Sequence, residues 1–201
     1  MEKVKCIEYR GVRDLVAAEV VSDTIESFEC GTPFSVAWMS ELSKETESSS
    51  ESHFYDNVPA NIIDSTGGDT VTIATSALPF DIVAKLTGQF YDEETGMFVE
   101  GDRESKYFAI GYVTEDTSGE EVFVWRLKGK FNIPSATHTT KSDGTDANGQ
   151  ELVFTGISTV HKFAKRGKSE RAVNCYASKC PLSETEFFST VQTPDTVKAS
   201  A

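Results

Sequence analysis

The stretch Phe123-Val-Trp-Arg-Leu-Lys-Gly-Lys-Phe131 carries the clearest structural signal in the chain. Apolar and basic residues alternate along it, and such alternation is typical of a β-strand that buries one face. The stretch therefore predicts a strand with an aromatic face and a basic face. The predicted aromatic face holds Phe123, Trp125, Leu127 and Phe131, and the opposite face holds Arg126, Lys128 and Lys130.

The segment just before this strand is expected to pair with it. Tyr107-Phe-Ala-Ile-Gly-Tyr-Val113 is apolar on both parities, which is typical of a strand that is covered on both faces. Between the two segments, Glu115-Asp-Thr-Ser-Gly119 has the composition of a turn. We therefore expect a β-hairpin here.

A second, longer hairpin is indicated upstream. Phe34 to Leu42 alternates like a half-buried strand, and apolar residues return from Phe54 to Ile63. Between them, Ser43 to Ser52 is polar, acidic and low in complexity, so we expect it to be a mobile loop. The two flanks are then the arms of one long hairpin, and the polar run is its extended tip.

One helix is predicted, over Ala77-Leu-Pro-Phe-Asp-Ile-Val-Ala-Lys-Leu-Thr-Gly88. Pro79 suits the first turn, and Asp81 complements the positive end of the helix dipole. Apolar residues recur on one face of this segment, and Gly88 suits the left-handed residue that ends many helices. A helix this short is not stable alone, so it is expected to pack on a sheet.

The other segments carry weaker signals. Residues 1–30 mix short apolar runs with charges, and strand and helix both stay open. Residues 64–69 indicate a turn before a further strand. Residues 152–163 indicate a strand, with residues 171–177 as its candidate partner.

The C-terminal residues differ in composition from the rest. After Pro181 the sequence is rich in Ser and Thr and offers few apolar residues for burial. We therefore expect one domain over residues 1–180 and a C-terminal arm or disordered tail over residues 181–201.

The charge balance excludes several partners. The chain has 32 Asp and Glu residues against 19 Lys and Arg residues, a formal net charge of -13. A surface of that sign repels phosphate backbones and anionic membranes, so we expect neither specific nucleic-acid binding nor membrane docking. The same sign suits a surface along which DNA slides without sticking.

Neither secretion nor zinc binding is indicated. The four cysteines lack a C-x-x-C spacing, and the three histidines are scattered. The N-terminus has no apolar stretch that would serve as a signal peptide, and no run is as long as a membrane span. We expect synthesis in a reducing cytoplasm, with the cysteines acting as small buried hydrophobes rather than forming disulfides.

Catalytic signatures are not recognisable in the sequence. The loop Asp143-x-x-Asp146-x-Asn148-Gly149 lacks the residue order and the distal glutamate of an EF-hand, so we expect a solvated turn. Paired carboxylates such as Glu120 and Glu121 are too unspecific to indicate a glycosidase. Nucleophile-elbow and phosphate-loop motifs do not occur. We therefore expect no enzyme activity, no metal and no cofactor.

A set of short motifs follows a familiar order from Phe54 onward. They are Phe54-Tyr-Asp-Asn57, Thr70-Val-Thr-Ile73, the predicted helix Leu78 to Gly88, the turn Tyr91 to Val99, Tyr107-Phe-Ala-Ile-Gly111, Val124-Trp-Arg-Leu-Lys-Gly-Lys-Phe131, Lys141, and Leu152 to Gly156. In this order and spacing the motifs resemble the major tail protein (tail-tube protein) family of siphophages that infect Gram-positive bacteria.

The resemblance implies both a fold and a role. The implied fold is mainly β, a β-sandwich or barrel with one flanking α-helix and a long hairpin loop, here residues 34–63. The implied role is a structural virion protein whose hexameric rings stack into a hollow tail tube for DNA ejection. Its implied partners are further copies of itself and the tape-measure, tail-terminator and distal-tail proteins, and DNA would pass through the lumen without specific binding. Assembly would take place in the host bacterial cytoplasm.

Two parts of the chain are expected to form contacts between subunits. On the family template the hairpin reaches a neighbouring ring, and the basic segment 162–171 of one copy is expected to meet the acidic segment 92–104 of another. An alternative function is a virion-associated carbohydrate- or receptor-binding β-sandwich, which would cluster exposed aromatic residues on one loop face. The expected contact residues are Trp38, Met39, Glu41, Lys44, Glu45, Glu47, Glu51, Phe54, Tyr55, Lys165, Arg166 and Lys168.

Overall fold

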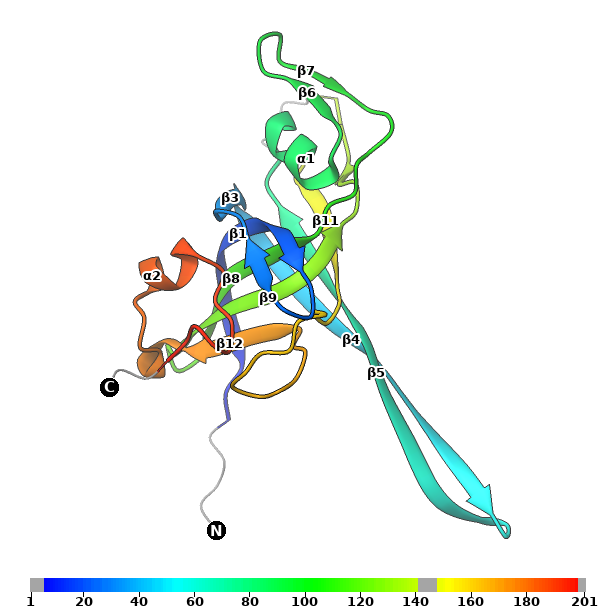
Figure 1. Ribbon diagram of the computed structural model, residues 1–201. Coiled ribbons are helices and arrows are strands. Elements are labelled where there is room, and N and C mark those ends of the chain that lie inside the picture. The colour runs from blue at the N-terminus through cyan, green and yellow to red at the C-terminus, as the bar shows by residue number, and fades with distance from the viewer. Residues whose placement is uncertain (1–5, 141–147, 199–201) are drawn as a thin grey trace.

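The computed structural model describes residues 6–140 and 148–198 and shows a mainly β protein (Figure 1). Its helical segments are α1 (Phe80–Thr87), the 3-10 turn η1 (Ala177–Lys179) and α2 (Glu184–Ser189). Its strands are β1 (Tyr9–Asp23), β2 (Phe28–Cys30), β3 (Phe34–Ala37), β4 (Met39–Tyr55), β5 (Val58–Thr75), β6 (Phe90–Asp92), β7 (Met97–Val99), β8 (Phe108–Asp116), β9 (Glu121–Phe131), β10 (Ser135–Ala136), β11 (Gln150–Gly156) and β12 (Ala172–Tyr176).

One large antiparallel sheet contains every described strand except the small hairpin β6–β7. The sheet follows the order β2-β1-β8-β9-β11-β5-β4. Strand β9 is its centre, because one edge of β9 pairs with β8 along most of its length, and the other edge is shared between two strands. Its first half pairs with β12 and its last residues pair with β11.

The two ends of the sheet come back towards each other through a bend at Trp38. Before the bend, β3 pairs with β1, and after it β4 pairs with β5. One continuous segment of chain therefore belongs to both ends of the curled sheet. The curl stops short of a closed barrel, and it agrees with the mainly β sandwich-or-barrel class that was predicted.

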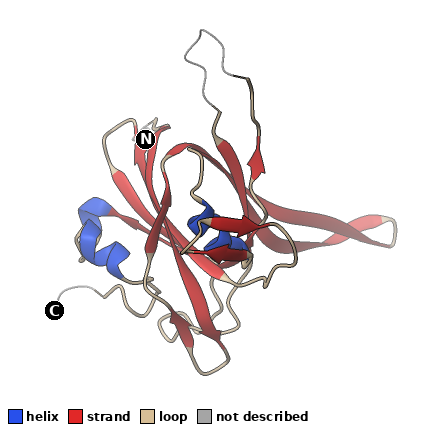
Figure 2. Cartoon of the chain, turned by 90° about the horizontal axis from the view of Figure 1, so that it is seen from above, coloured by secondary structure: helices blue, strands red, loops and turns tan. Residues whose placement is uncertain are grey.

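Each face of the central strands carries its own hydrophobic core. The first core joins the side chains of β5, β8 and β11 to Val83 and Leu86 of α1. The second core joins β8 and β9 to Phe163 and to Phe187 of α2. The two helices accordingly lie on different sides of the sheet (Figure 2). Strand β8 contributes to both cores, as its two-sided apolar sequence predicted.

The alternation along β9 holds only as far as a β-bulge. Between the pairs Phe108↔Gly129 and Ile110↔Arg126 the register shifts by one residue, so β9 has one more residue than β8 there. A one-residue shift moves the following side chains to the other face. Phe131 therefore lies in the first core, whereas Phe123 and Trp125 lie in the second. The prediction that all these aromatic residues share one face was wrong.

The long hairpin exists, but its predicted bounds were wrong. β4 and β5 pair from Met39↔Thr75 to Tyr55↔Val58, so residues 43–52 are strand rather than loop, and residues 64–69 are strand rather than turn. The reversal comes at Asp56 and Asn57, whose φ angles are 51° and 63°. Positive φ at both central residues is the mark of the tight turn that suits the twist of a hairpin.

Helix α1 ends at the glycine that the sequence indicated but begins at Phe80, three residues later than predicted. Pro79 stands at the N-cap, and Gly88 ends the helix with a left-handed φ of 72°. A side chain at position 88 would bring its Cβ within 2.0 Å of the Glu104 carbonyl oxygen, so only glycine fits here.

Three terminal or late segments were only partly foreseen. The N-terminal segment, left open between helix and strand, is the long strand β1. The predicted strand 152–163 is β11, which ends at Gly156, and the partner of β12 is β9 rather than β11. These pairings depend on the path of the intervening chain, which local patterns do not contain.

The C-terminal segment adds a second helix to the single helix that was predicted. Ser183 and Glu186 form a capping box at the start of α2, a signal that is visible in the sequence as Ser-x-x-Glu. Phe187 is fully buried in the second core, and its carbonyl oxygen accepts a hydrogen bond of 3.0 Å from Trp125 Nε1. The domain boundary at residue 180 itself stays a prediction.

Candidate assembly surface

The outer part of the β4–β5 hairpin projects from the body of the molecule (Figures 1 and 2). The pairing of β5 with β11 ends at Asp69↔Gly156, and beyond that point β4 and β5 pair only with each other. Val58 lies eleven positions before Asp69 in the sequence, so the arm is about 36 Å long at the usual rise per strand residue.

Apolar side chains are exposed near the tip of this arm. Phe54, Tyr55 and Val58 leave 64%, 65% and 59% of their surface open to solvent, and Ile62 and Ile63 are also exposed. Contiguous exposed apolar residues on a soluble chain mark a surface that is covered by a partner. The tip is therefore the first component of the candidate assembly surface.

The remaining length of the arm is polar on both faces. Ser49 Oγ lies 2.6 Å from Ser65 Oγ, and Ser50 Oγ donates to Asp64 at 2.6 Å. No face of this part is buried, which explains why its sequence lacks an alternating apolar pattern. The predicted contact residues Glu47 and Glu51 are exposed on this part of the arm, and Glu45 is exposed just inside its base, opposite Thr70.

The other predicted hairpin residues lie at its base. Trp38 is 85% exposed at the bend between β3 and β4. Met39 is partly buried against the first core. Glu41 and Lys44 are exposed and line a groove between β4 and the sheet.

This groove has a volume of about 920 Å³. Its walls mix apolar and basic side chains, because Tyr9, Leu42 and Tyr112 line it together with Arg10 and Arg126. The groove therefore presents a mixed apolar and polar surface, with charges of both signs, close to the base of the hairpin.

The part of the sheet around β8 and β9, the subsheet, has an unpaired strand edge at each of its two sides. Residues 9–13 of β1 pair only with β8, and β12 pairs only with β9, so the local order is β1-β8-β9-β12. Among the described residues no strand pairs with the outer side of either. An unpaired strand edge is a template for pairing with another chain.

The predicted basic residues lie away from the hairpin, on the loop between β11 and β12. Phe163 and Lys168 close a tight turn that carries Lys165 and Arg166, and Arg166 lies 3.4 Å from Glu170. The Asp195 carboxylate accepts hydrogen bonds from the backbone N–H groups of Ala164 and Lys165, each at 2.8 Å. These bonds hold the pKa of Asp195 below its usual value. The acidic β6–β7 hairpin lies at the opposite end of the body (Figure 1).

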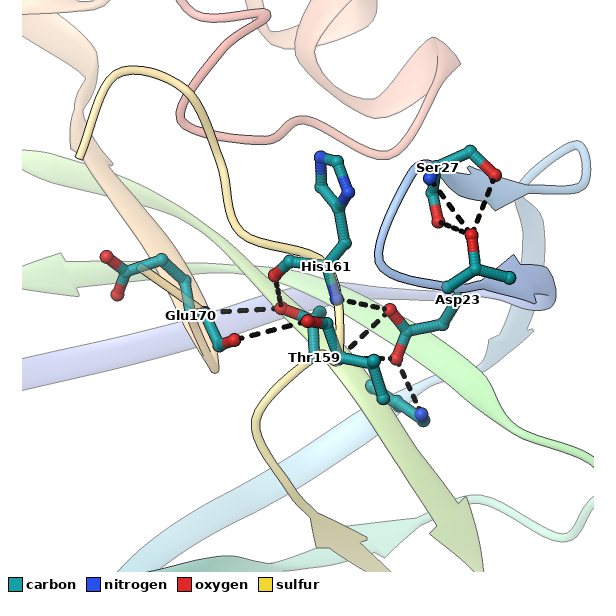
Figure 3. Close-up of polar contacts among 9 residues, drawn as sticks. Asp23, Ser27, Thr159, His161 and Glu170 are labelled. Carbon is teal, nitrogen blue, oxygen red and sulfur yellow. Dashed lines mark hydrogen bonds and ion pairs between the residues drawn. The ribbon is translucent and has the colours of Figure 1, made fainter. Parts of the chain in front are cut away.

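A buried carboxylate on β1 forms an ion pair with β9 and also holds the start of this loop (Figure 3). The Asp23 carboxylate accepts bonds from Lys128 Nζ at 2.6 Å and from the backbone N–H groups of Val160 and His161 at 2.8 and 2.9 Å. Burial acts to raise the pKa of Asp23, but Lys128 and the two N–H groups outweigh it, so the pKa lies below its usual value. The loop is thereby fixed against the sheet.

A second buried ion pair lies where the hairpin leaves the body. Arg126 of β9 and Asp69 of β5 contact each other at 2.5 Å, and their side chains are 9% and 7% exposed. Sequence reasoning placed Arg126 on a polar face and gave Asp69 to a turn, so it missed this pair.

The described residues hold no cluster of three or more His, Cys, Asp or Glu side chains that would bind a metal ion. Most of the acidic loop at residues 143–149 lies outside the described residues. Cys30 packs against the second core, where burial raises the pKa of its thiol to about 12. Within the described part of the chain no helix is long and apolar enough to cross a membrane.

A projecting hairpin with an apolar tip and a subsheet with two free edges together define a structural subunit that associates with other chains. The sequence places this subunit among known proteins, because residues 47–185, more than half of the chain, match the phage tail tube protein family. The chain belongs to that family, which is structural rather than catalytic, and it is a component of the phage tail. No curated protein matches the chain.

Proposed function

We propose that copies of this protein close into hexameric rings, and that these rings stack into a hollow tail tube through which DNA is ejected. The observation that carries the proposal is the projecting hairpin with its exposed apolar tip, in a chain of the tail tube family. The apolar side chains at the tip have no partner in their own chain. Covering them with a second copy removes apolar surface from water and so lowers the free energy of association.

Contacts within a ring form between the free strand edges. Residues 9–13 of β1 in one copy pair with β12 of the next, so the four-stranded subsheets join into one continuous inner wall. Pairing around a closed ring removes both edges from solvent. Head-to-tail pairing of two different edges gives an open filament unless the rotation between copies closes it into a ring, and a closed ring leaves no edge unpaired.

Contacts between rings form through the hairpin and through complementary charges. The hairpin of one ring lies on the adjacent ring, with Phe54, Tyr55 and the exposed glutamates as contact residues. The basic loop with Lys165, Arg166 and Lys168 faces the acidic β6–β7 end of the next copy, since the two lie at opposite ends of the body. Opposite charges at stacked ends raise the rate and fix the orientation of association.

The overall charge suits a conduit for DNA. A net charge of -13 disfavours adhesion of phosphates to the wall. Tape-measure, tail-terminator and distal-tail proteins are the remaining partners that this role requires.

Electron microscopy of the purified protein tests the proposal directly. We expect negatively stained samples at high concentration to show rings or hollow tubes, with fast-sedimenting species in the same preparation. A variant in which a two-residue Asn-Gly turn replaces residues 50–64 is expected to fold and to fail to stack. This variant keeps the pair Ser49↔Ser65 and the buried base of the hairpin. Tubes of normal length from the shortened variant would contradict the role of the hairpin in stacking. A wild-type protein that stays monomeric with its native tail partners present would contradict the proposal that it forms a tube.

A further inference from the structure

Asp69 lies at the point where the hairpin leaves the sheet. Its pairing partners are Gly156 on β11 and Thr46 on β4, and it is the last residue of β5 that pairs with β11. The residue is 5% exposed. Its carboxylate is therefore a charged group at the boundary between the supported and the unsupported part of the hairpin.

Three donors surround this carboxylate. Arg126 Nη1 donates to Oδ2 at 2.5 Å, Thr46 Oγ1 donates to Oδ1 at 2.8 Å, and Arg171 Nη1 donates to Oδ1 at 3.2 Å. A buried carboxylate needs such partners, because burial without them is costly. We refer to Asp69, Thr46, Arg126 and Arg171 as the Asp69 clamp.

The clamp connects the hairpin to several separate parts of the body. Arg126 belongs to β9 and its Nε donates to Tyr112 Oη of β8 at 3.2 Å. Arg171 precedes β12, and its Nη1 also donates to the carbonyl oxygen of Gly67 at 2.6 Å. Gly67 lies two residues beyond Asp69 towards the tip of the arm. Both strands of the hairpin, β9 and the segment before β12 therefore meet at one carboxylate, and β8 is joined to it through Arg126.

The strand ladder itself is weak at this point. The register of β4 and β5 shifts between Thr46 and Ser48, and such irregularities let a strand bend. Gly67 and Gly68 follow on the other strand, and a Cβ at Gly68 would lie 2.7 Å from the Gly156 carbonyl oxygen. Glycine within a strand offers no side chain to stiffen it. Side-chain contacts must therefore supply the rigidity that the backbone lacks here.

The length of the arm makes its direction sensitive to this joint. Over about 36 Å, a rotation of roughly 10° at the base moves the tip by roughly 6 Å. Contacts of packed side chains extend over only about 4 Å, so such a movement would misplace the tip on any rigid partner.

We propose that Asp69 is a positioning residue: through Thr46, Arg126 and Arg171 it fixes the direction in which the hairpin projects. Loss of the clamp lets the arm swing while the body stays folded. The effect on the direction of the arm does not depend on what the arm binds, and only its consequence for tube growth rests on the proposed function.

Distance measurements between two spin labels test the proposal. The labels are attached at positions 62 and 162 through a ketone-bearing amino acid, which leaves the four native cysteines unchanged, and the protein is studied as a dilute monomer. In the wild-type protein we expect one narrow distance distribution, since both label sites lie on ordered segments. The Asp69→Asn protein is expected to give a distribution at least twice as broad, and its tubes are expected to grow at least ten times more slowly.

Two further variants complete the experiment. Asp64→Asn removes an equivalent carboxylate from the exposed part of the same strand, where its described partner is Ser50, and it is expected to keep the narrow distribution and normal growth. Arg171→Gln opens the clamp but leaves the Asp69–Arg126 pair intact, and it is expected to broaden the distribution to an intermediate width even if Asp69→Asn does not fold.

The outcomes separate the two proposals. A narrow, wild-type distribution in folded Asp69→Asn protein, or in Arg171→Gln protein when the first variant does not fold, overturns the clamp. A broadened distribution in a protein whose wild-type form never makes tubes supports the clamp and contradicts the proposed function. Broadening together with slow tube growth supports both.

Discussion

Two charged residues on the central strand of this protein have buried carboxylate partners rather than solvent. Lys128 pairs with Asp23, whose side chain is 4% exposed, and Arg126 pairs with Asp69. A buried carboxylate that loses its partner is left with the full cost of its desolvation. The stability of the fold therefore depends on keeping these buried charges paired.

The Asp23–Lys128 pair predicts a loss of stability in acid. The pKa of Asp23 in the folded protein lies below its usual value of 3.8, so the carboxylate stabilises the fold fully above that value, and the contribution is lost as the pH falls through the folded pKa. We expect the free energy of unfolding in urea to fall on acidification below about pH 4, and to fall less steeply in Asp23→Asn protein. At neutral pH this variant should be less stable by about 3 kcal/mol.

A matched control for this prediction is Asp102→Asn, which removes an exposed carboxylate. It should leave the unfolding free energy within about 0.5 kcal/mol of wild type. Equal acid sensitivity of the wild-type and Asp23→Asn proteins would contradict the assigned role of the pair.

The two tryptophans provide a second prediction at the scale of single residues. Trp125 is fully buried and donates a hydrogen bond to the Phe187 carbonyl oxygen, whereas Trp38 is 85% exposed. Trp125→Phe leaves a cavity and an unpaired buried carbonyl, so it should cost about 2–4 kcal/mol of unfolding free energy. Trp38→Phe should change stability by less than about 0.5 kcal/mol. Chemical denaturation measures the unfolding free energy of both variants. Proteolysis after residue 180 should become faster in Trp125→Phe protein but not in Trp38→Phe protein.

At the scale of elements, glycines with the same backbone conformation have different surroundings. Gly88 ends α1 with φ of 72°, and a Cβ there would meet the Glu104 carbonyl oxygen at 2.0 Å, while Gly119 has φ of 79° and open space around it. Gly119→Ala should therefore cost about 1 kcal/mol for the conformation alone. Gly88→Ala should cost clearly more, about 3 kcal/mol, because the backbone must also move. Thermal unfolding measures the loss of stability in both variants. Equal losses would show that the backbone at Glu104 moves away from the new Cβ at no measurable cost.

Elements with a strong local signal were predicted with bounds correct to within three residues. The β8–β9 hairpin and α1 were both visible, because a two-sided apolar strand, a turn and a capped helix each depend on neighbours in sequence. The arm of the long hairpin was harder to read. Neither of its faces is buried, so the alternation that identifies a strand was missing, and Asp56-Asn57 was overlooked as the turn.

At the scale of the whole molecule, opposite charges lie at opposite ends. The β6–β7 end carries an excess of acidic residues, and the loop between β11 and β12 carries basic ones. Replacing Lys162→Glu together with Lys168→Glu should slow tube growth about tenfold at low ionic strength. The difference should shrink as salt shortens the screening length to about 8 Å and below. Light scattering at several salt concentrations follows the growth.

The control for this charge reversal is Lys179→Glu together with Lys85→Glu, which makes the same change of -4 in net charge without touching the basic loop. Both lysines are exposed and lie on other elements. If the control slows growth as much as the loop variant does, the effect comes from net charge rather than from the loop, and the proposed stacking contact fails.

Local patterns in the sequence determined the mainly β class, the helix with its glycine stop, the existence of a long hairpin and the resemblance to tail tube proteins. Each of these rests on residues that are close together in the chain, where period, turn chemistry and motif order are directly legible. The acidic balance, and with it the exclusion of ordinary nucleic-acid binding, is also a property of the sequence alone.

Only the tertiary structure decided which residues face each other over long separations. Asp69 and Arg126 lie 57 residues apart, and Asp23 and Lys128 lie 105 residues apart. Their contact depends on strand order and on a one-residue bulge that carries Phe131 to the opposite core. A register shift of one residue exchanges the two faces of a strand, and no local pattern records it. For that reason the joint that directs the hairpin became visible only in the folded protein.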